Sequence, residues 1–338
     1  MALLCFSVLI LVHEGGHFFF ARRFGVPVKE FSVGMGPKLV SFHSKKYETV
    51  YAIRALPIGG FVSMVGEDED SADANAFCRK PVWQRMCITV AGAVTNIVIG
   101  FLAMFILLLS SNQTLLSTKV AEFREGATSV QSGLQVDDTI LAVNGDRVHT
   151  GYELVYAITH DGYEPVDLLI ERDGVEILLE DVVFPTTVED GLVFGEYDFL
   201  PYGYRDKPLG RLLTHTFWRS TMAVEMVWDS IVDLFSGRYG MEQVSGPIGA
   251  TQQIGEAAKA GSFSLIYMIS IISINLGIMN LLPFPALDGG RLLFQCIELI
   301  RRKPMKMEVE AYINFAGLVV LLGFMLYISF KDVMNLFG

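Results

Sequence analysis

Four long apolar stretches constrain the fold of this chain more than any other feature of its sequence. They cover about residues 1–21, 86–110, 262–282 and 311–330, close to the roughly 20 mostly apolar residues that a helix needs to cross a bilayer. A polar segment of about 150 residues separates the second stretch from the third, long enough for a domain of its own. The sequence therefore predicts a polytopic α-helical membrane protein with four transmembrane helices and one inserted domain.

The distribution of charge predicts how these helices are oriented. The 338 residues carry a net charge of −11, but Lys and Arg are concentrated in residues 22–85 and 283–310. Because short loops rich in Lys and Arg stay in the cytoplasm, both segments are expected inside. The acidic inserted segment and both termini are then expected outside. The negative charge of the inserted segment argues against nucleic acid as a partner.

The N-terminal stretch is not expected to be a cleaved signal peptide, because no basic residue precedes its apolar run, although a stretch upstream of Met1 is possible. The four cysteines fall in the spans or in the inner segments. No disulfide framework is therefore expected in the outer domain.

The first apolar stretch contains the sequence HEGGH at residues 13–17. In a helix, His13 and His17 share a face, so both imidazoles can reach one metal ion, and Glu14 lies close enough to remove a proton from a metal-bound water. An ionised residue at mid-bilayer costs about 2.5–3.5 kcal/mol, so such residues are functional by default. The alternative is a histidine pair whose polar atoms are satisfied by neighbouring helices.

Asp288, in the sequence NLLPFPALDGG, is the candidate for the third protein ligand that a catalytic zinc site requires. The first and third spans run in the same direction, so Asp288 and the histidines are expected at similar depth towards the cytoplasm. Pro283 and Pro285 break the third span and predict a non-helical ligand loop. Asn280 is a candidate to hold the substrate backbone or an oxyanion; the alternative is a helix-cap or loop hydrogen bond.

Three polar segments also have residue patterns that predict their secondary structure. Residues 28–65 alternate like strands and predict β-hairpins against the inner membrane face, with an irregular amphipathic loop as the alternative. Residues 119–185 alternate strand-like runs with one helix near 151–160, and SGLQVDDTILAVNGDRV resembles the PDZ domain, which binds extended peptides at a sheet edge. Residues 211–236 predict an amphipathic helix, either on the outer membrane surface or packed against the PDZ-like domain.

HEGGH in the first span, a PDZ-like insertion and NxxPxPxLDGG at the third span together resemble the site-2 protease family of intramembrane zinc metalloproteases. The likeness is greatest to the bacterial regulator-of-sigma-E protease branch. Four further segments of this chain also resemble motifs of that branch: FSVGMGP, LPIGGFVSM, AGAVTN and SGPIG. The resemblance implies a Zn²⁺ ion held by His13, His17 and Asp288, with Glu14 as the catalytic base. It also implies that a strand containing Gly59, Gly60, Phe61 and Val62 pairs with an unwound substrate helix, and that Asn280 helps to hold it.

The same resemblance implies the setting. The substrates would be single-span proteins in the bacterial inner membrane that a site-1-type protease has already trimmed, such as anti-sigma factors or signal-peptide remnants. The PDZ-like domain would exclude bulky ectodomains. The chain departs from the family in two respects, because it has room for one PDZ-like domain where the best-known members have two, and Ala93 stands where proline is usual. Asn96 matches a family asparagine, with packing as the alternative role.

The expected organisation is a first transmembrane helix with HEGGH (1–24), an inner β region (25–85), a second helix (86–110), the PDZ-like domain (111–190), a linker with an amphipathic helix (191–261), a third helix with the LDGG loop (262–290), an inner loop (291–310) and a fourth helix (311–338). A zinc transporter and a catalytically inactive PDZ scaffold are the alternative functions. The first leaves Glu14 and the inserted domain unexplained, and the second leaves an intact HExxH unexplained.

Overall fold

The computed structural model describes residues 2–337 except residues 47, 190, 242 and 245. Within the described chain, four helical stretches are long and apolar enough to cross a membrane: Leu3–Arg23, Val82–Ser110, Ser262–Leu281 and Met307–Met334. The chain divides into two compact units, one of Met1–Ala103 with Gly240–Gly338 and one of Met104–Tyr239. Four apolar helices and separate sheets fit a multi-pass membrane protein.

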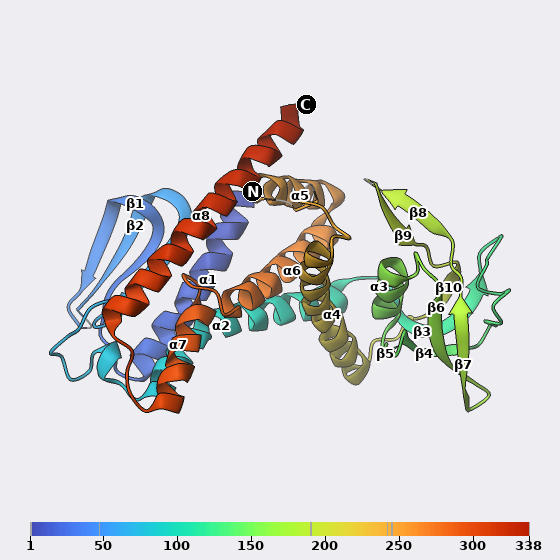
Figure 1. The fold of residues 1–338 in the computed structure, drawn as a ribbon, viewed down its shortest axis with the longest axis horizontal. Coiled ribbons are helices and arrows are strands. Elements are labelled where there is room, and N and C mark those ends of the chain that lie inside the picture. Colours follow the sequence, from blue (N-terminus) through green and yellow to red (C-terminus); the bar gives the residue numbers. More distant parts are fainter. Residues whose placement is uncertain (1, 47, 190, 242, 245, 338) are drawn as a thin grey trace. The chain divides into compact units, whose positions relative to one another are not determined.

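The first unit is built mainly from helices, with one small sheet (Figure 1). Its elements are α1 (Ala2–Arg23), β1 (Val28–Ser44), β2 (Thr49–Met64), a 3₁₀ turn (Phe77–Arg79), the first part of α2 (Val82–Ser110), α5 (Pro247–Ala260), α6 (Ser262–Leu281), α7 (Asp288–Arg301) and α8 (Met307–Phe337). Pro81 immediately precedes α2, where a residue without an N–H is tolerated, and α2 begins four residues before the expected position.

The sheet of this unit consists of two long, bent strands rather than several short hairpins. The first half of β1 pairs on both sides, so that Val33 faces Gly60 on one side and Ile53 on the other. This leaves residues 60–64 of β2 with β1 on one side only, and no described strand pairs with their other side. We call this free side the outer edge of β2.

A small apolar core fixes this edge beside α1. Ala21, Val28, Met64 and Ile88 are all buried in one cluster that joins α1, the start of β1, the end of β2 and α2. The two helices also approach closely, because a Cβ on Gly16 would lie 2.5 Å from the Ala91 carbonyl oxygen. The end of β2 is therefore held next to the helix that carries HEGGH.

Two helices of this unit differ from the expected loops. α7 occupies most of the segment 291–310 and begins at Asp288, so the candidate ligand stands at a helix N-terminus and not in a non-helical loop. α5 lies in a segment expected to be linker, and its first turn is capped from a distance. The Asp332 carboxylate of α8 accepts the N–H groups of Gly246 and Gly249, each at 3.0 Å.

The second unit contains an antiparallel sheet in the order β10-β3-β4-β6-β7, with β5 paired to β4, and a separate hairpin of β8 and β9. Its elements are β3 (Leu115–Phe123), β4 (Thr139–Val143), β5 (Asp146–Arg147), α3 (Gly151–Asp161), β6 (Val166–Arg172), β7 (Val175–Val182), β8 (Thr186–Glu189), β9 (Leu192–Gly195), β10 (Phe199–Tyr204) and α4 (Leu209–Ser236). Leu154 and Ile158 of α3 pack into the buried core of this sheet.

Helix α4 packs against α3 with a polar face. The Tyr156 hydroxyl donates to Asp229 at 2.8 Å, and His160 Nε2 lies 2.9 Å from Asp233. Leu212, Met222 and Ala223 of α4 are buried. Other apolar residues of this helix are exposed and recur at helical spacing on one face, namely Leu213, Phe217, Val224, Trp228 and Phe235. The helix therefore combines packing on the second unit with an uncovered apolar stripe.

Candidate metal centre

His13, His17 and Asp288 meet at one point in the first unit. The two Nε2 atoms are 3.2 Å apart, and Asp288 Oδ2 lies 3.1 Å from the first and 3.2 Å from the second. Both histidines are 8% exposed, so the cluster is shielded from solvent. Two imidazole nitrogens and a carboxylate oxygen are the donor set of a three-ligand catalytic zinc site.

The orientation of His17 suits metal binding. Its Nδ1 lies 2.8 Å from the Ile88 carbonyl oxygen, which can only accept, so Nδ1 carries the proton and the Nε2 lone pair faces the other ligands. Asp288 Oδ2 lies within 3.2 Å of both Nε2 atoms, and a carboxylate that binds a metal does so in its ionised form. Asp288 would therefore supply the one negative charge of the donor set.

A glycine of α2 makes room for both histidines. A Cβ on Gly92 would lie 2.3 Å from His17 Nε2 and 2.9 Å from His13 Cε1. No side chain larger than hydrogen therefore fits at this position while the rings keep their places. Gly92 belongs to the AGAVTN motif, but reasoning from the sequence assigned it no role.

Close backbone packing fixes Asp288 at the start of α7. A Cβ on Gly289 would lie 2.1 Å from the Leu282 carbonyl oxygen, so the connection from α6 folds tightly against the first turn of α7. Further along α7, Gln295 Nε2 donates to the Thr89 hydroxyl of α2 at 2.9 Å. Contacts with α2 therefore position both the histidines of α1 and Asp288 of α7.

Glu14 lies beside this cluster and contacts the outer edge of β2. Its Oε2 accepts the Val62 N–H at 3.0 Å. Glu14 and the three candidate ligands line a cavity of about 200 Å³. The other lining residues are Phe61, Val62, Met64, Glu67, Thr89 and Arg291.

The remaining candidates are placed differently. Gly60 approaches the base, because a Cβ built on it would lie 3.8 Å from Glu14 Cγ, whereas one on Gly59 would meet the Met35 side chain. Asn280 donates to the Leu276 carbonyl of its own helix at 2.9 Å and is not among the residues that line the cavity. Asn96 is fully buried in α2, where its backbone carbonyl accepts the Ser273 hydroxyl of α6 at 2.8 Å.

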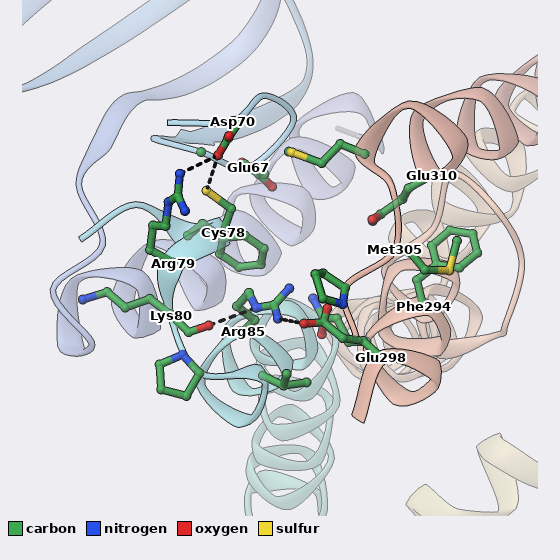
Figure 2. Close-up of a pocket in the computed structure, with 17 residues that line it drawn as sticks. Glu67, Asp70, Cys78, Arg79, Lys80, Arg85, Phe294, Glu298, Met305 and Glu310 are labelled. Atoms are coloured by element: carbon green, nitrogen blue, oxygen red, sulfur yellow. Dashed lines mark hydrogen bonds and ion pairs between the residues drawn. The ribbon is translucent and has the colours of Figure 1, made fainter. Parts of the chain in front are cut away.

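A larger cavity of about 560 Å³ adjoins the candidate centre, and Glu67 lines both (Figure 2). Its walls carry two ion pairs, Arg79 with Asp70 at 3.1 Å and Arg85 with Glu298 at 2.5 Å. Glu67 and Arg291 are residues that reasoning from the sequence missed. Glu67 stands in an acidic run, EDED, which alone predicts only a solvated turn.

A glutamate directly after the first of two histidines one helical turn apart is the arrangement found in metallopeptidases. In this chain the arrangement lies in a helix able to cross a membrane, which makes the class a membrane-embedded metallopeptidase. Known sequences agree with this assignment.

Peptidase family M50 matches residues 1–324 of the chain. A putative zinc metalloprotease of Clostridium perfringens is 35% identical, across 98% of this chain and 97% of the relative. One of Fusobacterium nucleatum is 33% identical, across 100% and 99%. The regulator of sigma-W protease RasP of Bacillus subtilis is 27% identical, across 99% and 98%. This chain belongs to peptidase family M50, the site-2 protease family, and is an intramembrane zinc metalloprotease whose expected cofactor is Zn²⁺.

Proposed function

We propose that this protease performs regulated intramembrane proteolysis, cutting within the transmembrane segments of single-span proteins that a site-1-type protease has already trimmed. The observation that carries the proposal is the convergence of His13, His17 and Asp288 beside Glu14, on or just beyond membrane-spanning helices. Anti-sigma factors and signal-peptide remnants both belong to this substrate class. A relative named for regulating sigma-W supports the first of them.

In this proposal His13, His17 and Asp288 hold Zn²⁺ and Glu14 is the general base. Zn²⁺ at such a site polarises a carbonyl and lowers the pKa of a bound water from 15.7 to about 7. Glu14 lines the same cavity as the three ligands, so its carboxylate can accept a proton there and pass it to the leaving amine. The bond between His17 Nδ1 and the Ile88 carbonyl keeps the ring turned towards the ion.

The outer edge of β2 is the proposed docking place for the substrate. A helix in lipid satisfies its own backbone hydrogen bonds, so its peptide bonds become accessible only after it unwinds. Adding the unwound segment as a strand to residues 60–64 would replace the lost bonds. The free side of this edge and the contact between Val62 and Glu14 support the assignment, because a strand added here would lie at the base.

The second unit is proposed to be a PDZ-like gate outside the membrane. Support comes from the resemblance of residues 132–148 to PDZ sequences and from the packing of α3 on the antiparallel sheet. The apolar stripe of α4 is suited to rest on the membrane surface. The distribution of Lys and Arg supports the bacterial inner membrane orientation in which this unit and both termini lie outside and the metal centre lies towards the cytoplasm.

The test compares the wild type with Glu14→Gln in detergent, measuring zinc content and the cleavage of tagged, pre-trimmed single-span substrates. We expect both proteins to bind about one zinc and only the wild type to cut, since the amide cannot accept the proton. The aspartate ligand is tested in parallel with Asp288→Asn, which is expected to lose zinc. A wild type that binds zinc but cuts none of several trimmed substrates would refute the proposed function.

A further inference from the structure

Two carboxylates cover the outer edge of β2. The Val62 N–H donates to Glu14 Oε2 at 3.0 Å, and the Met64 N–H donates to Glu67 Oε2 at 3.1 Å. Residues two apart in a strand present their backbone groups on the same side, so both N–H groups belong to the side that a substrate strand would use. A substrate carbonyl can bind at either position only if the carboxylate leaves.

The two carboxylates differ in how firmly they are held. Arg291 of α7 donates to Glu67 Oε1 and also to Asp68 Oδ1 at 2.7 Å, and the Glu67 side chain is only 14% exposed. Charge-assisted bonds from a guanidinium are among the stronger hydrogen bonds in proteins. Among the described residues, no cation forms an ion pair with Glu14. Glu14 is therefore free to leave Val62, whereas Glu67 is fixed on Met64.

Glu67 also marks a boundary between two spaces. It lines the cavity of the metal centre, together with Val62 and Met64, and it lines the larger cavity shown in Figure 2. Arg291 stands three residues after Asp288 on α7, so one helix carries both the candidate ligand and the cation that holds Glu67. The end of the free edge is thus placed at a fixed distance from the metal centre.

We propose that Glu67, anchored by Arg291, is a register stop that ends the substrate strand opposite Val62 and so selects which peptide bond lies at the metal centre. The inference rests on the proposed addition of the substrate to this edge. Glu67 is a positioning residue in this scheme: it acts on the substrate by occupying the Met64 N–H and takes no part in the chemistry.

The stop has a measurable consequence, because strand registers that differ by two residues keep the same side chains on the same faces, whereas a shift by one exchanges the faces. A substrate released from the stop therefore moves by two residues. A hydrogen bond involving a charged group is strong enough to impose a preference of about 10-fold or more between two registers.

The experiment determines the cleavage position in a tagged single-span substrate by mass spectrometry of both products. Wild type is expected to give one main pair of products, and Glu67→Ala a second pair displaced by two residues in an amount comparable to the first. Glu67→Gln keeps an oxygen that can accept the Met64 N–H but turns an NH2 group towards Arg291, so it loses the anchor and should give a mixture in which the first position still dominates. Asp70→Ala is the matched control, since Asp70 stands on the same acidic run, is 73% exposed and pairs with Arg79 away from the edge.

A second measurement does not depend on turnover. In a Glu14→Gln background, a photo-reactive residue is moved along the substrate to find the position that cross-links to β2, and Glu67→Ala is expected to add a cross-link two positions away. Arg291→Gln removes the anchor but leaves the edge carboxylate in place and is expected to give a mixture of both registers. This variant decides the question if Glu67→Ala does not fold.

An unchanged cleavage position and unchanged cross-links in these variants would overturn the inference. Loss of all cleavage by Glu67→Ala with zinc still bound and cross-links unaltered would also overturn it, because Glu67 would then serve catalysis and not register. These results are distinct from failure of the proposed function, in which the wild type itself binds zinc and cuts nothing.

Discussion

Substitution of Gly92 by alanine tests the arrangement of the candidate zinc ligands most directly. The added Cβ would lie 2.3 Å from His17 Nε2 and 2.9 Å from His13 Cε1, which is too close for atoms that are not bonded to each other. Either the rings turn away from each other or α2 moves off α1, and the second movement stretches the bond between His17 and the Ile88 carbonyl. Overpacking of this kind typically costs about 1–3 kcal/mol. Zinc should therefore bind about 5- to 150-fold more weakly.

The assay is competition for zinc between the purified protein in detergent and a chelator of known affinity, with cleavage measured on the same samples. Gly15→Ala is the matched control, because it adds the same methyl group inside HEGGH where nothing lies within 4 Å. Alanine is also the better helix former by about 1 kcal/mol, so this control should bind zinc normally and unfold at a slightly higher temperature. If Gly92→Ala held zinc as tightly as the wild type, the proposed ligand geometry would be refuted.

Three further outcomes are expected. Val62→Pro removes the N–H that donates to Glu14 and leaves the candidate zinc ligands untouched, so cleavage should fall below detection with zinc retained. Cleavage near the wild-type rate would contradict strand addition at the outer edge of β2. Deletion of residues 119–185 should admit untrimmed substrates, and an unaltered substrate range would argue against gating. Hydrogen bonding to Asp161 raises the pKa of His160 despite partial burial, so its stabilising charge is complete below about pH 6.5 and disappears as pH rises through the raised pKa. The unfolding temperature should therefore fall as the pH rises through the pKa of His160 in the wild type, and fall less in His160→Gln. If the unfolding temperatures of the two proteins changed with pH in parallel, His160 would not be the cause.

The parts of the fold that follow from composition and local pattern could be predicted from the sequence. The four apolar helices follow from the length of their apolar runs, and the helix at Gly151–Asp161 follows from spacing alone. The candidate site followed from HEGGH combined with the direction of the spans, since parallel helices bring their C-terminal ends to one face. These inferences use only distances along the chain and the geometry of single elements.

Features that depend on contacts between distant segments could not be predicted in this way. The helix α5 contains two glycines, Gly249 and Gly255, and no side chain at its N-cap forms a capping bond; its cap, Asp332, comes from α8. The need for glycine at position 92 appears only when α2 is placed against His17. Glu67 reads as part of a solvated acidic run until Arg291 is brought beside it by the fold.

The capping of α5 also bears on how this protein is made. Asp332 reaches the N–H groups of Gly246 and Gly249 across more than eighty residues of sequence, and neighbouring Lys331 donates to the Met241 carbonyl at 2.9 Å. A ribosome delivers α5 well before it delivers these two side chains, so the N–H groups of Gly246 and Gly249 stay uncapped until α8 has been made. Helix α5 contacts both α1 and α6, so the completion of the proteolytic unit waits for α8.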